Sequence, residues 1–159
     1  MKYEFDVKMT TSAMYDYMMY HTMTGMQFYL AVGIGIMAIA AFVIDHNPLY
    51  LIAGLVMLLY LPCERYIQAG RQVKLNPVFK ENLHYTLDDE KMSIDVKEEH
   101  MEAPWDTVTK VRSTRKSLIL YTGNVTATIF PRESLGSDYA GVVSLIKDRV
   151  PAGRVRIKG

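Results

Sequence analysis

Two long stretches of this chain lack charged side chains altogether. Asp, Glu, Lys and Arg are absent from Tyr17 to Ile44 and again from Asn47 to Cys63, although 22% of the 159 residues are charged. Half of the residues are hydrophobic, which is close to the average for a globular protein. The apolar residues are therefore concentrated in one block, and the rest of the chain carries the charge.

Cysteine is almost absent as well. The single cysteine, Cys63, excludes an intramolecular disulfide and any metal site built from several cysteines. It ends an apolar run beside Pro62, so we interpret it as a small buried hydrophobic residue. A redox-active or lipidated thiol is the alternative interpretation.

The familiar catalytic and cofactor motifs are missing too. The four histidines lack the spacing of metal ligands, and there is no phosphate-binding glycine loop and no nucleophile elbow. His100-Met-Glu102 matches the H-x-E element of zinc deaminases, but the second cysteine pair of such sites is lacking. A net charge of +1 gives no reason to expect nucleic-acid binding. The sequence therefore predicts a protein that is not an enzyme and has no catalytic residue, cofactor, metal site or nucleic-acid partner. An enzyme of unknown class is the alternative, and it would need a concave site with perturbed titratable groups.

The two uncharged runs predict a transmembrane helical hairpin. The stretch from Met26 to Ile44 covers about 28 Å as a helix, close to the ~30 Å hydrocarbon core, and it has no polar face. The second run, Leu49 to Cys63, spans if its helix continues through Tyr66, with Arg65 snorkelling toward the headgroups. The segment 45–48 between them predicts a tight turn in which Asp45 or Asn47 caps the second helix.

Small residues predict how the two helices pack. Ala31, Gly35 and Ala38 share one helix face, and this spacing lets helices approach closely in lipid. We expect this face to pack against Gly54, with a dimerisation face as the alternative.

Positive charges flank the hairpin and are absent from its turn, which predicts the orientation. The flanking cations are Lys2, Lys8, Arg65, Arg71 and Lys74. Because positive charge stays cytoplasmic, both termini are expected inside, in a multi-pass protein of a bacterial inner (plasma) membrane. A cleaved signal peptide and a helical hairpin buried in a soluble protein are the competing interpretations. About 25 mixed residues, three of them acidic, precede the first run and disfavour a signal peptide.

Alternating patterns predict strands on both sides of the hairpin. Lys2 to Met9 alternates as a half-buried strand, and Thr11 or Ser12 is expected to cap a short helix through Tyr20. Beyond the hairpin, Asn76 is expected to cap a short helix from Val78 to Asn82. The strands expected after it are 83–87, 92–96, 101–105, 108–113, 117–122 and 125–130, with turns at 88–90, 97–99 and Gly123-Asn124.

The last predicted element is an amphipathic helix. Its apolar face consists of Tyr139, Val142, Val143 and Ile146; Ser137 or Asp138 is the expected cap, and Pro151 and Gly153 end the helix. A meander of antiparallel strands curls into a half-open barrel that one helix can close. This is the architecture of pleckstrin-homology-like (PH-like) domains, and we expect the N-terminal strand to join the same sheet.

Short motifs in the second half of the chain resemble the YcxB-like family. They are Ala103-Pro-Trp105-Asp-Thr-Val108 with Val111, Leu118-Ile-Leu-Tyr121, and Ile129-Phe-Pro-Arg-Glu-Ser-Leu135. Together with two early helices they cover essentially the whole chain, and most lie between residues 100 and 150. The resemblance implies a two-helix anchor and a PH-like domain, in which Trp105 and Pro131 are structural. It implies no known activity and no catalytic residue.

The expected fold is therefore a membrane-anchored α+β protein in four parts. Residues 1–25 form a strand and short helix that join the cytoplasmic domain, and residues 26–67 form the transmembrane hairpin. Residues 75–150 form the PH-like antiparallel β half-barrel capped by a C-terminal helix, and residues 151–159 form a basic tail with Arg154, Arg156 and Lys158.

A cluster of basic residues gives the one candidate binding surface, for a protein or a lipid. It comprises Lys110, Arg112, Arg115 and Lys116, with Arg132 expected nearby. The leading hypothesis is a non-enzymatic, membrane-anchored binding or scaffold module with a protein partner. The alternative is a module that senses anionic lipid at the inner leaflet, where each exposed cation could contribute about 1 kcal/mol. A solvated basic face is the third interpretation, and self-association into a homo-oligomer is a further possibility.

Overall fold

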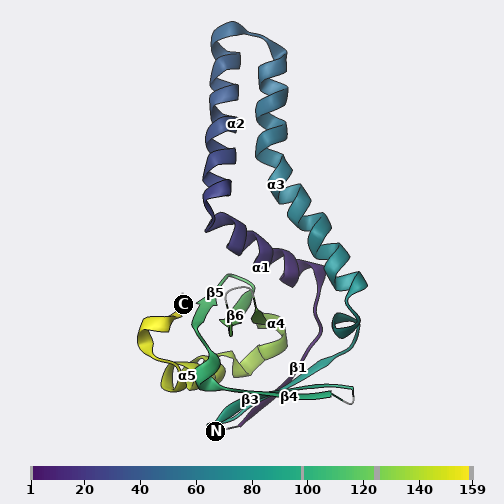
Figure 1. Ribbon diagram of the computed structural model, residues 1–159, viewed down its shortest axis with the longest axis vertical. Helices are drawn as coiled ribbons and strands as arrows, with labels where there is room; N and C mark the ends of the chain where they lie inside the picture. The colour runs from purple at the N-terminus through teal and green to yellow at the C-terminus, as the bar shows by residue number, and fades with distance from the viewer. Residues whose placement is uncertain (1, 98, 124–125, 158–159) are drawn as a thin grey trace.

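The chain is a mixed α+β protein in which a helical hairpin projects from a β-rich end (Figure 1). This computed structural model describes residues 2–97, 99–123 and 126–157. Its helices are α1 (Thr11–Met23), α2 (Met26–Asp45), α3 (Pro48–Leu75), α4 (Arg132–Leu135) and α5 (Tyr139–Arg149). Its strands are β1 (Tyr3–Val7), β2 (Leu83–Leu87), β3 (Lys91–Val96), β4 (Glu99–Pro104), β5 (Lys110–Ser113), β6 (Ser117–Tyr121), β7 (Ala127–Pro131) and β8 (Val155–Arg156). Single 3₁₀ turns lie at Pro77–Lys80, Trp105–Thr107, Gly136–Asp138 and Ala152–Arg154.

Helices α2 and α3 pair side by side and leave most of their surface exposed. Both are long and apolar enough to cross a membrane, and only 6% of each apolar window is buried. Asn47 caps α3 as predicted, because its Oδ1 accepts the Leu49 N–H at 3.0 Å. The helix α3 runs to Leu75, nine residues beyond the predicted limit at Tyr66, and Pro62 lies inside it.

The predicted contact between Gly35 and Gly54 is confirmed. A Cβ atom built on Gly54 would lie 2.9 Å from the Gly35 carbonyl oxygen, and one built on Gly35 would lie 3.3 Å from the Gly54 oxygen. Only glycine lets two helix backbones approach this closely.

Helix α1 connects the hairpin to the β-rich part. The cap is Thr10, whose Oγ1 accepts the Ala13 N–H at 3.2 Å, so the predicted caps Thr11 and Ser12 are wrong. The difference arises because Thr10 has the extended backbone that a cap requires, whereas Thr11 is already helical. A small second core joins α1, α3 and β7 through Met9, Ala13, Met14, Ala69 and Ile129.

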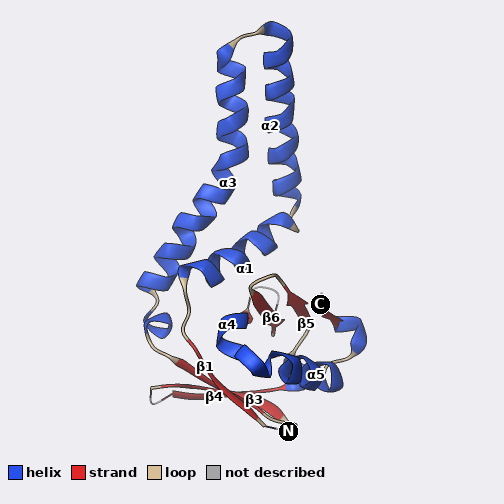
Figure 2. Cartoon of the chain, turned by 180° about the vertical axis from the view of Figure 1, so that it is seen from behind, coloured by secondary structure: helices blue, strands red, loops and turns tan. Residues whose placement is uncertain are grey.

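The strands form two four-stranded sheets. In the first, the order is β1-β2-β3-β4, all antiparallel, with Phe5 opposite Tyr85. The expected pairing of the N-terminal strand with the strands beyond the hairpin is thus confirmed. In the second sheet the order is β7-β6-β5-β8, and β8 runs parallel to β5. Figure 2 shows the second sheet between α1 and the first sheet.

Two features of this topology differ from the expectation. The meander is interrupted at Trp105–Thr107, because Pro104 cannot donate to the sheet and the chain turns there. The buried Trp105 closes this corner, and its Nε1–H donates to the Asp88 carbonyl at 2.9 Å. The predicted tail is wrong for Val155 and Arg156, which pair with Val111 and Arg112 of β5.

The larger core is centred on aromatic side chains and lies between the two sheets and α5. The Phe130 ring packs edge-on against Tyr85 and Phe5, at centroid distances of 4.8 and 5.2 Å. Helix α5 buries Val142 and Ile146 as predicted. Asp138, one of the two predicted caps, occupies the N-cap position of α5, but its side chain makes no capping hydrogen bond, because the 3₁₀ turn Gly136–Asp138 continues directly into α5.

The β6–β7 hairpin is confirmed by the pairing of Tyr121 with Ala127. Asn124 of the predicted Gly123-Asn124 turn lies outside the described residues, as does Glu98 of the turn at 97–99 and Lys158 of the basic tail.

Candidate functional site

The predicted basic residues belong to consecutive elements of the second sheet. Lys110 and Arg112 alternate along β5, so both side chains lie on the same face of the sheet. Arg115 and Lys116 lie in the turn to β6 and are exposed. Arg132 is the first residue of α4, directly after β7, and its backbone N–H donates to the Lys116 carbonyl at 2.8 Å.

This face of the second sheet is directed toward α1 and the hairpin. Lys110 lies opposite Tyr121 and Arg112 opposite Ile119 in the β5–β6 register. The Tyr121 ring lies 6.3 Å from the Tyr17 ring of α1. Because paired residues share a face, Lys110 and Arg112 lie on the same side of the sheet as Tyr121, which is the side of α1. Figure 1 shows β5 and β6 next to α1.

Four of the five cations form one basic face, which we define as Lys110, Arg112, Arg115 and Lys116. The Lys110 ammonium lies 5.2 Å from the Tyr121 ring centroid, and Lys116 Nζ donates to Ser12 Oγ of α1 at 2.9 Å. Arg112 Nη1 donates to the carbonyls of Val111 and Arg154, at 2.7 and 3.2 Å. None of the four forms an ion pair with a carboxylate among the described residues.

Neighbouring groups leave this charge largely uncompensated. Burial raises the pKa of Tyr121 to about 12, so this phenol stays neutral near pH 7. The Asp16 carboxylate of α1 accepts a hydrogen bond from the Thr114 hydroxyl in the β5–β6 turn. Arg156 of β8 lies beside Arg112. The sequence did not predict this neighbour, because it placed Arg156 in a tail.

Arg132 does not join the basic face. Its guanidinium lies 4.5 Å from the Tyr139 ring centroid of α5, and its Nε is buried without a hydrogen-bond partner. The Arg132 backbone lies next to Lys116, as expected, but its side chain packs against Tyr139 of α5.

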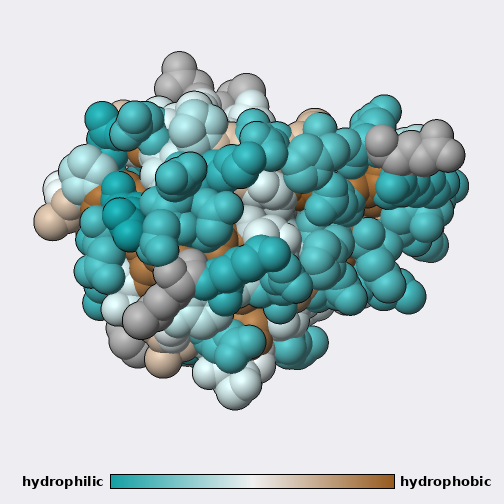
Figure 3. Space-filling model, turned by 90° about the horizontal axis from the view of Figure 1, so that it is seen from below, coloured by the Kyte–Doolittle hydropathy of each residue, from teal (hydrophilic) through white to brown (hydrophobic). Residues whose placement is uncertain are grey.

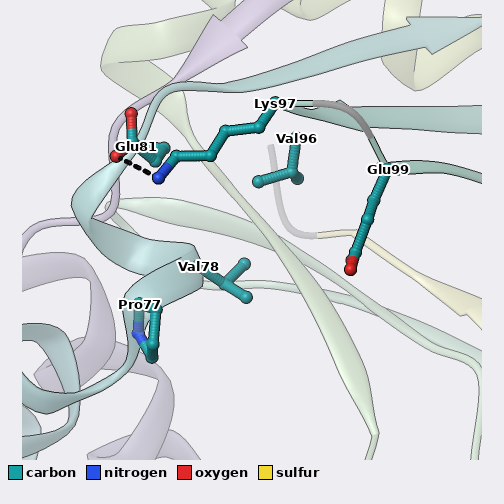
Figure 4. Close-up of a pocket in the computed structure, with 6 residues that line it drawn as sticks. All are labelled: Pro77, Val78, Glu81, Val96, Lys97 and Glu99. Atoms are coloured by element: carbon teal, nitrogen blue, oxygen red, sulfur yellow. Dashed lines mark ion pairs between the residues drawn. The ribbon is translucent and has the colours of Figure 1, made fainter.

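One surface pocket lies between the 3₁₀ turn after α3 and the end of β3, with a volume of about 390 Å³ (Figure 4). It is lined by Pro77, Val78, Glu81, Val96, Lys97 and Glu99. Lys97 Nζ and Glu81 Oε1 form an ion pair at 3.0 Å across its rim. These two charges neutralise each other, and Glu99 is the remaining charged side chain of the lining.

A longer apolar groove of about 450 Å³ runs between the two sheets. Ile94 of β3, Met101 of β4 and Phe79 line one side, and Thr128 and Ile129 of β7 line the other. The outer edge of β7 has no strand partner among the described residues. Unpaired edges next to apolar grooves are surfaces to which extended peptides add.

The H-x-E pattern belongs to a ladder of charges on β3 and β4. His100 bonds to Asp95, and its Nε2 lies 2.9 Å from Glu102 Oε1. The hydrogen bond with Asp95, followed by that with Glu102, raises the pKa of His100. All three side chains are exposed, and the described residues contain no group of three suitable metal ligands. This arrangement is a surface salt-bridge ladder.

Comparison with models of protein families finds a family that matches part of the chain. The model of the family described as YcxB-like protein matches residues 87–146, from the end of β2 into α5. No curated protein and no solved structure matches the chain.

Proposed function

Since the chain carries a YcxB-like domain over residues 87–146, we propose that it is a membrane-anchored, non-enzymatic binding module of that family. In this proposal α2 and α3 cross the bacterial inner membrane, and the two sheets with α5 form a PH-like domain on the cytoplasmic side. The domain holds a protein partner at the membrane surface.

The exposure of the hairpin carries the membrane assignment. Large apolar side chains cover its outer surface; Met26, Met37, Val43, Ile44 and Leu49 are each more than 60% exposed. Core helices of soluble proteins are mostly buried, whereas the apolar windows of α2 and α3 are 6% buried. The domain end facing away from the hairpin is mainly hydrophilic (Figure 3). An apolar hairpin beside a hydrophilic domain is the distribution expected when the hairpin lies in a bilayer and the domain in water.

The distribution of charges supports the proposed cytoplasmic side for the domain. The turn between the helices contains Asp45 and His46 and no lysine or arginine, whereas Arg71 and Lys74 follow on the domain side of α3. Positive charge is retained in the cytoplasm, which supports an orientation with both termini inside.

The domain offers two surfaces for binding. The apolar groove and the free edge of β7 fit an extended peptide, which would gain backbone hydrogen bonds from the edge. The basic face fits an acidic segment of a partner, since no described carboxylate neutralises it. These surfaces support a protein partner as the leading proposal.

Binding to anionic lipid is the second candidate, and the orientation of the basic face favours it. This face lies on the side of the domain from which the hairpin emerges, so a short tether holds it toward the leaflet. Four cations near an anionic surface could contribute about 1 kcal/mol each at low ionic strength.

Crosslinking in cells tests the proposal with a matched pair of variants. Arg115→Glu with Lys116→Glu reverses two exposed charges of the basic face, and Lys80→Glu with Lys147→Glu makes the same charge change at exposed cations elsewhere. A near-stoichiometric partner that is lost in the first variant and kept in the second supports protein binding. Recovery of the chain alone, or only with itself, contradicts the protein-partner proposal and favours lipid binding or self-association.

Extraction of membranes at alkaline pH tests the anchor separately. An integral hairpin stays in the membrane pellet, whereas a chain released into the supernatant contradicts the anchor.

A further inference from the structure

A third pocket, not used by the proposed function, lies at the base of the hairpin, where α1, the start of α2 and the middle of α3 meet. Its volume is about 470 Å³. Six of its lining side chains carry hydrogen-bonding groups: Tyr17, His21, Thr22, Gln27, Arg65 and Gln68. No carboxylate lines it, so the described wall of the pocket carries donors and one fixed positive charge.

The charge belongs to Arg65, whose guanidinium is incompletely satisfied. Nη1 donates to Gln68 Oε1 at 2.6 Å, and Nε is buried with no hydrogen-bond partner. Arg65 forms no ion pair with a described residue. The guanidinium as a whole is partly exposed, but its Nε–H is shielded from water without a partner, and an anion that occupies the pocket could accept from it.

The depth of the pocket fits a phospholipid headgroup. Arg65 lies about 26 Å along α3 from Pro48, and Met26 lies about 28 Å along α2 from Asp45. Both distances place the pocket at the domain-side limit of the ~30 Å hydrocarbon core, where lipid phosphates lie. The helix α2 also begins there without a side-chain cap, which adds the positive end of a 20-residue helix to the Arg65 charge.

We propose that this pocket binds the phosphate of an anionic phospholipid, with Arg65 as the anchoring residue and Gln68 holding its guanidinium. A planar guanidinium matches two phosphate oxygens, while the acyl chains extend along the exposed apolar surface of α2 and α3. This inference rests on the proposed membrane anchor. It concerns a site separate from the basic face of the β-rich domain.

The test is native mass spectrometry of the full-length, delipidated protein in mild detergent, titrated with phosphatidylglycerol. The variant Arg65→Gln is expected to weaken binding of one lipid by about ten- to hundredfold, the loss typical of a charge-assisted contact. Arg71→Gln is the matched control, because Arg71 is exposed on the same helix outside the pocket. It is expected to bind as the wild type does.

A second variant and a competition with inorganic phosphate complete the test. Arg65→Lys keeps the charge and loses the two-pronged contact, so it serves if the glutamine variant does not fold; its binding is expected to lie between those of wild type and Arg65→Gln. The inference would be refuted if Arg65→Gln bound the lipid as tightly as the wild type does. Where only Arg65→Lys folds, the same result with that variant refutes it. Displacement of the lipid by excess inorganic phosphate would overturn the lipid source and leave a site for free phosphate.

The outcome is separable from that of the anchor. Loss of the wild-type chain from alkali-treated membranes contradicts the proposed function, whereas a variant that stays in the membrane and still binds the lipid normally contradicts this inference alone.

Discussion

Adding one methyl group at Gly54 is expected to weaken the pairing of α2 with α3. In Gly54→Ala the new Cβ would lie 2.9 Å from the Gly35 carbonyl oxygen and 2.7 Å from Ile39 Cγ1, where ordinary contacts begin near 3.4 Å. The Ile39 side chain can rotate, but the carbonyl belongs to the backbone. The helices must therefore separate by about 0.5 Å at this point, which forfeits about a quarter of each contact along the seam.

The expected cost is about 1–3 kcal/mol in the free energy of unfolding of the hairpin. Gly33→Ala is the matched control, because a Cβ on Gly33 meets nothing within 4 Å. This control is expected to be neutral or to stabilise α2 by up to about 1 kcal/mol, since alanine favours helices more than glycine does. Both variants leave the charge and the domain unchanged.

The assay is unfolding of the full-length protein in mixed detergent micelles, followed by helical circular dichroism as the denaturing detergent is increased. The midpoint should fall for Gly54→Ala and hold or rise for Gly33→Ala. Equal shifts for the two variants would refute the close backbone contact between the helices.

The domain gives three further predictions. Phe130→Ala should lower the free energy of unfolding by about 3–5 kcal/mol, because Phe130 is fully buried against Phe5 and Tyr85; a loss below 1 kcal/mol in thermal unfolding would contradict that packing. Trp105→Phe should cost about 0.5–1.5 kcal/mol through the lost hydrogen bond to the Asp88 carbonyl, and unchanged stability by circular dichroism would argue against this bond. The raised pKa of His100 should stabilise the fold below pH 6.5, and this contribution should disappear as the pH rises through the folded-state pKa. His100→Gln should remove that part of the pH profile, and a profile identical to that of the wild type would speak against the ladder.

The sequence predicted the hairpin well because its signal is local. A lack of charge marks both helices, and Asn47 with Pro48 marks the turn between them. The end of α3 was not predictable in the same way. Pro62 usually stops a helix, yet α3 continues past it, because Ala69 farther along packs against α1.

The second sheet shows where local patterns fail. Two residues, Val155 and Arg156, are too short a strand for any periodicity, and their pairing with β5 depends on the path of the chain after α5. Alternation also could not indicate the interruption at Trp105, since both sheets present the same pattern.

The sequence predicted which basic residues belong to the candidate site, but not which residues from elsewhere in the chain lie around them. The density of cations at 110–116 is visible in the sequence. Their partners are distant along the chain: Ser12 contacts Lys116, and the Arg154 carbonyl contacts Arg112. The pocket at Arg65 depends similarly on α1 lying across the base of the hairpin, which only the tertiary structure provides.

The pairing of β1 with β2 makes the whole apolar hairpin an insertion within one β-hairpin connection. Strand β1 leaves the ribosome before β2, and residues 8–82 must be made before its partner follows. The first sheet therefore closes after both apolar helices have emerged. For the proposed membrane anchor, this order would let the helices enter a bilayer before the domain can enclose them. The chain then connects the domain to the helices twice, once after β1 and once before β2. The domain therefore cannot rotate about the hairpin as freely as a domain on a single linker would.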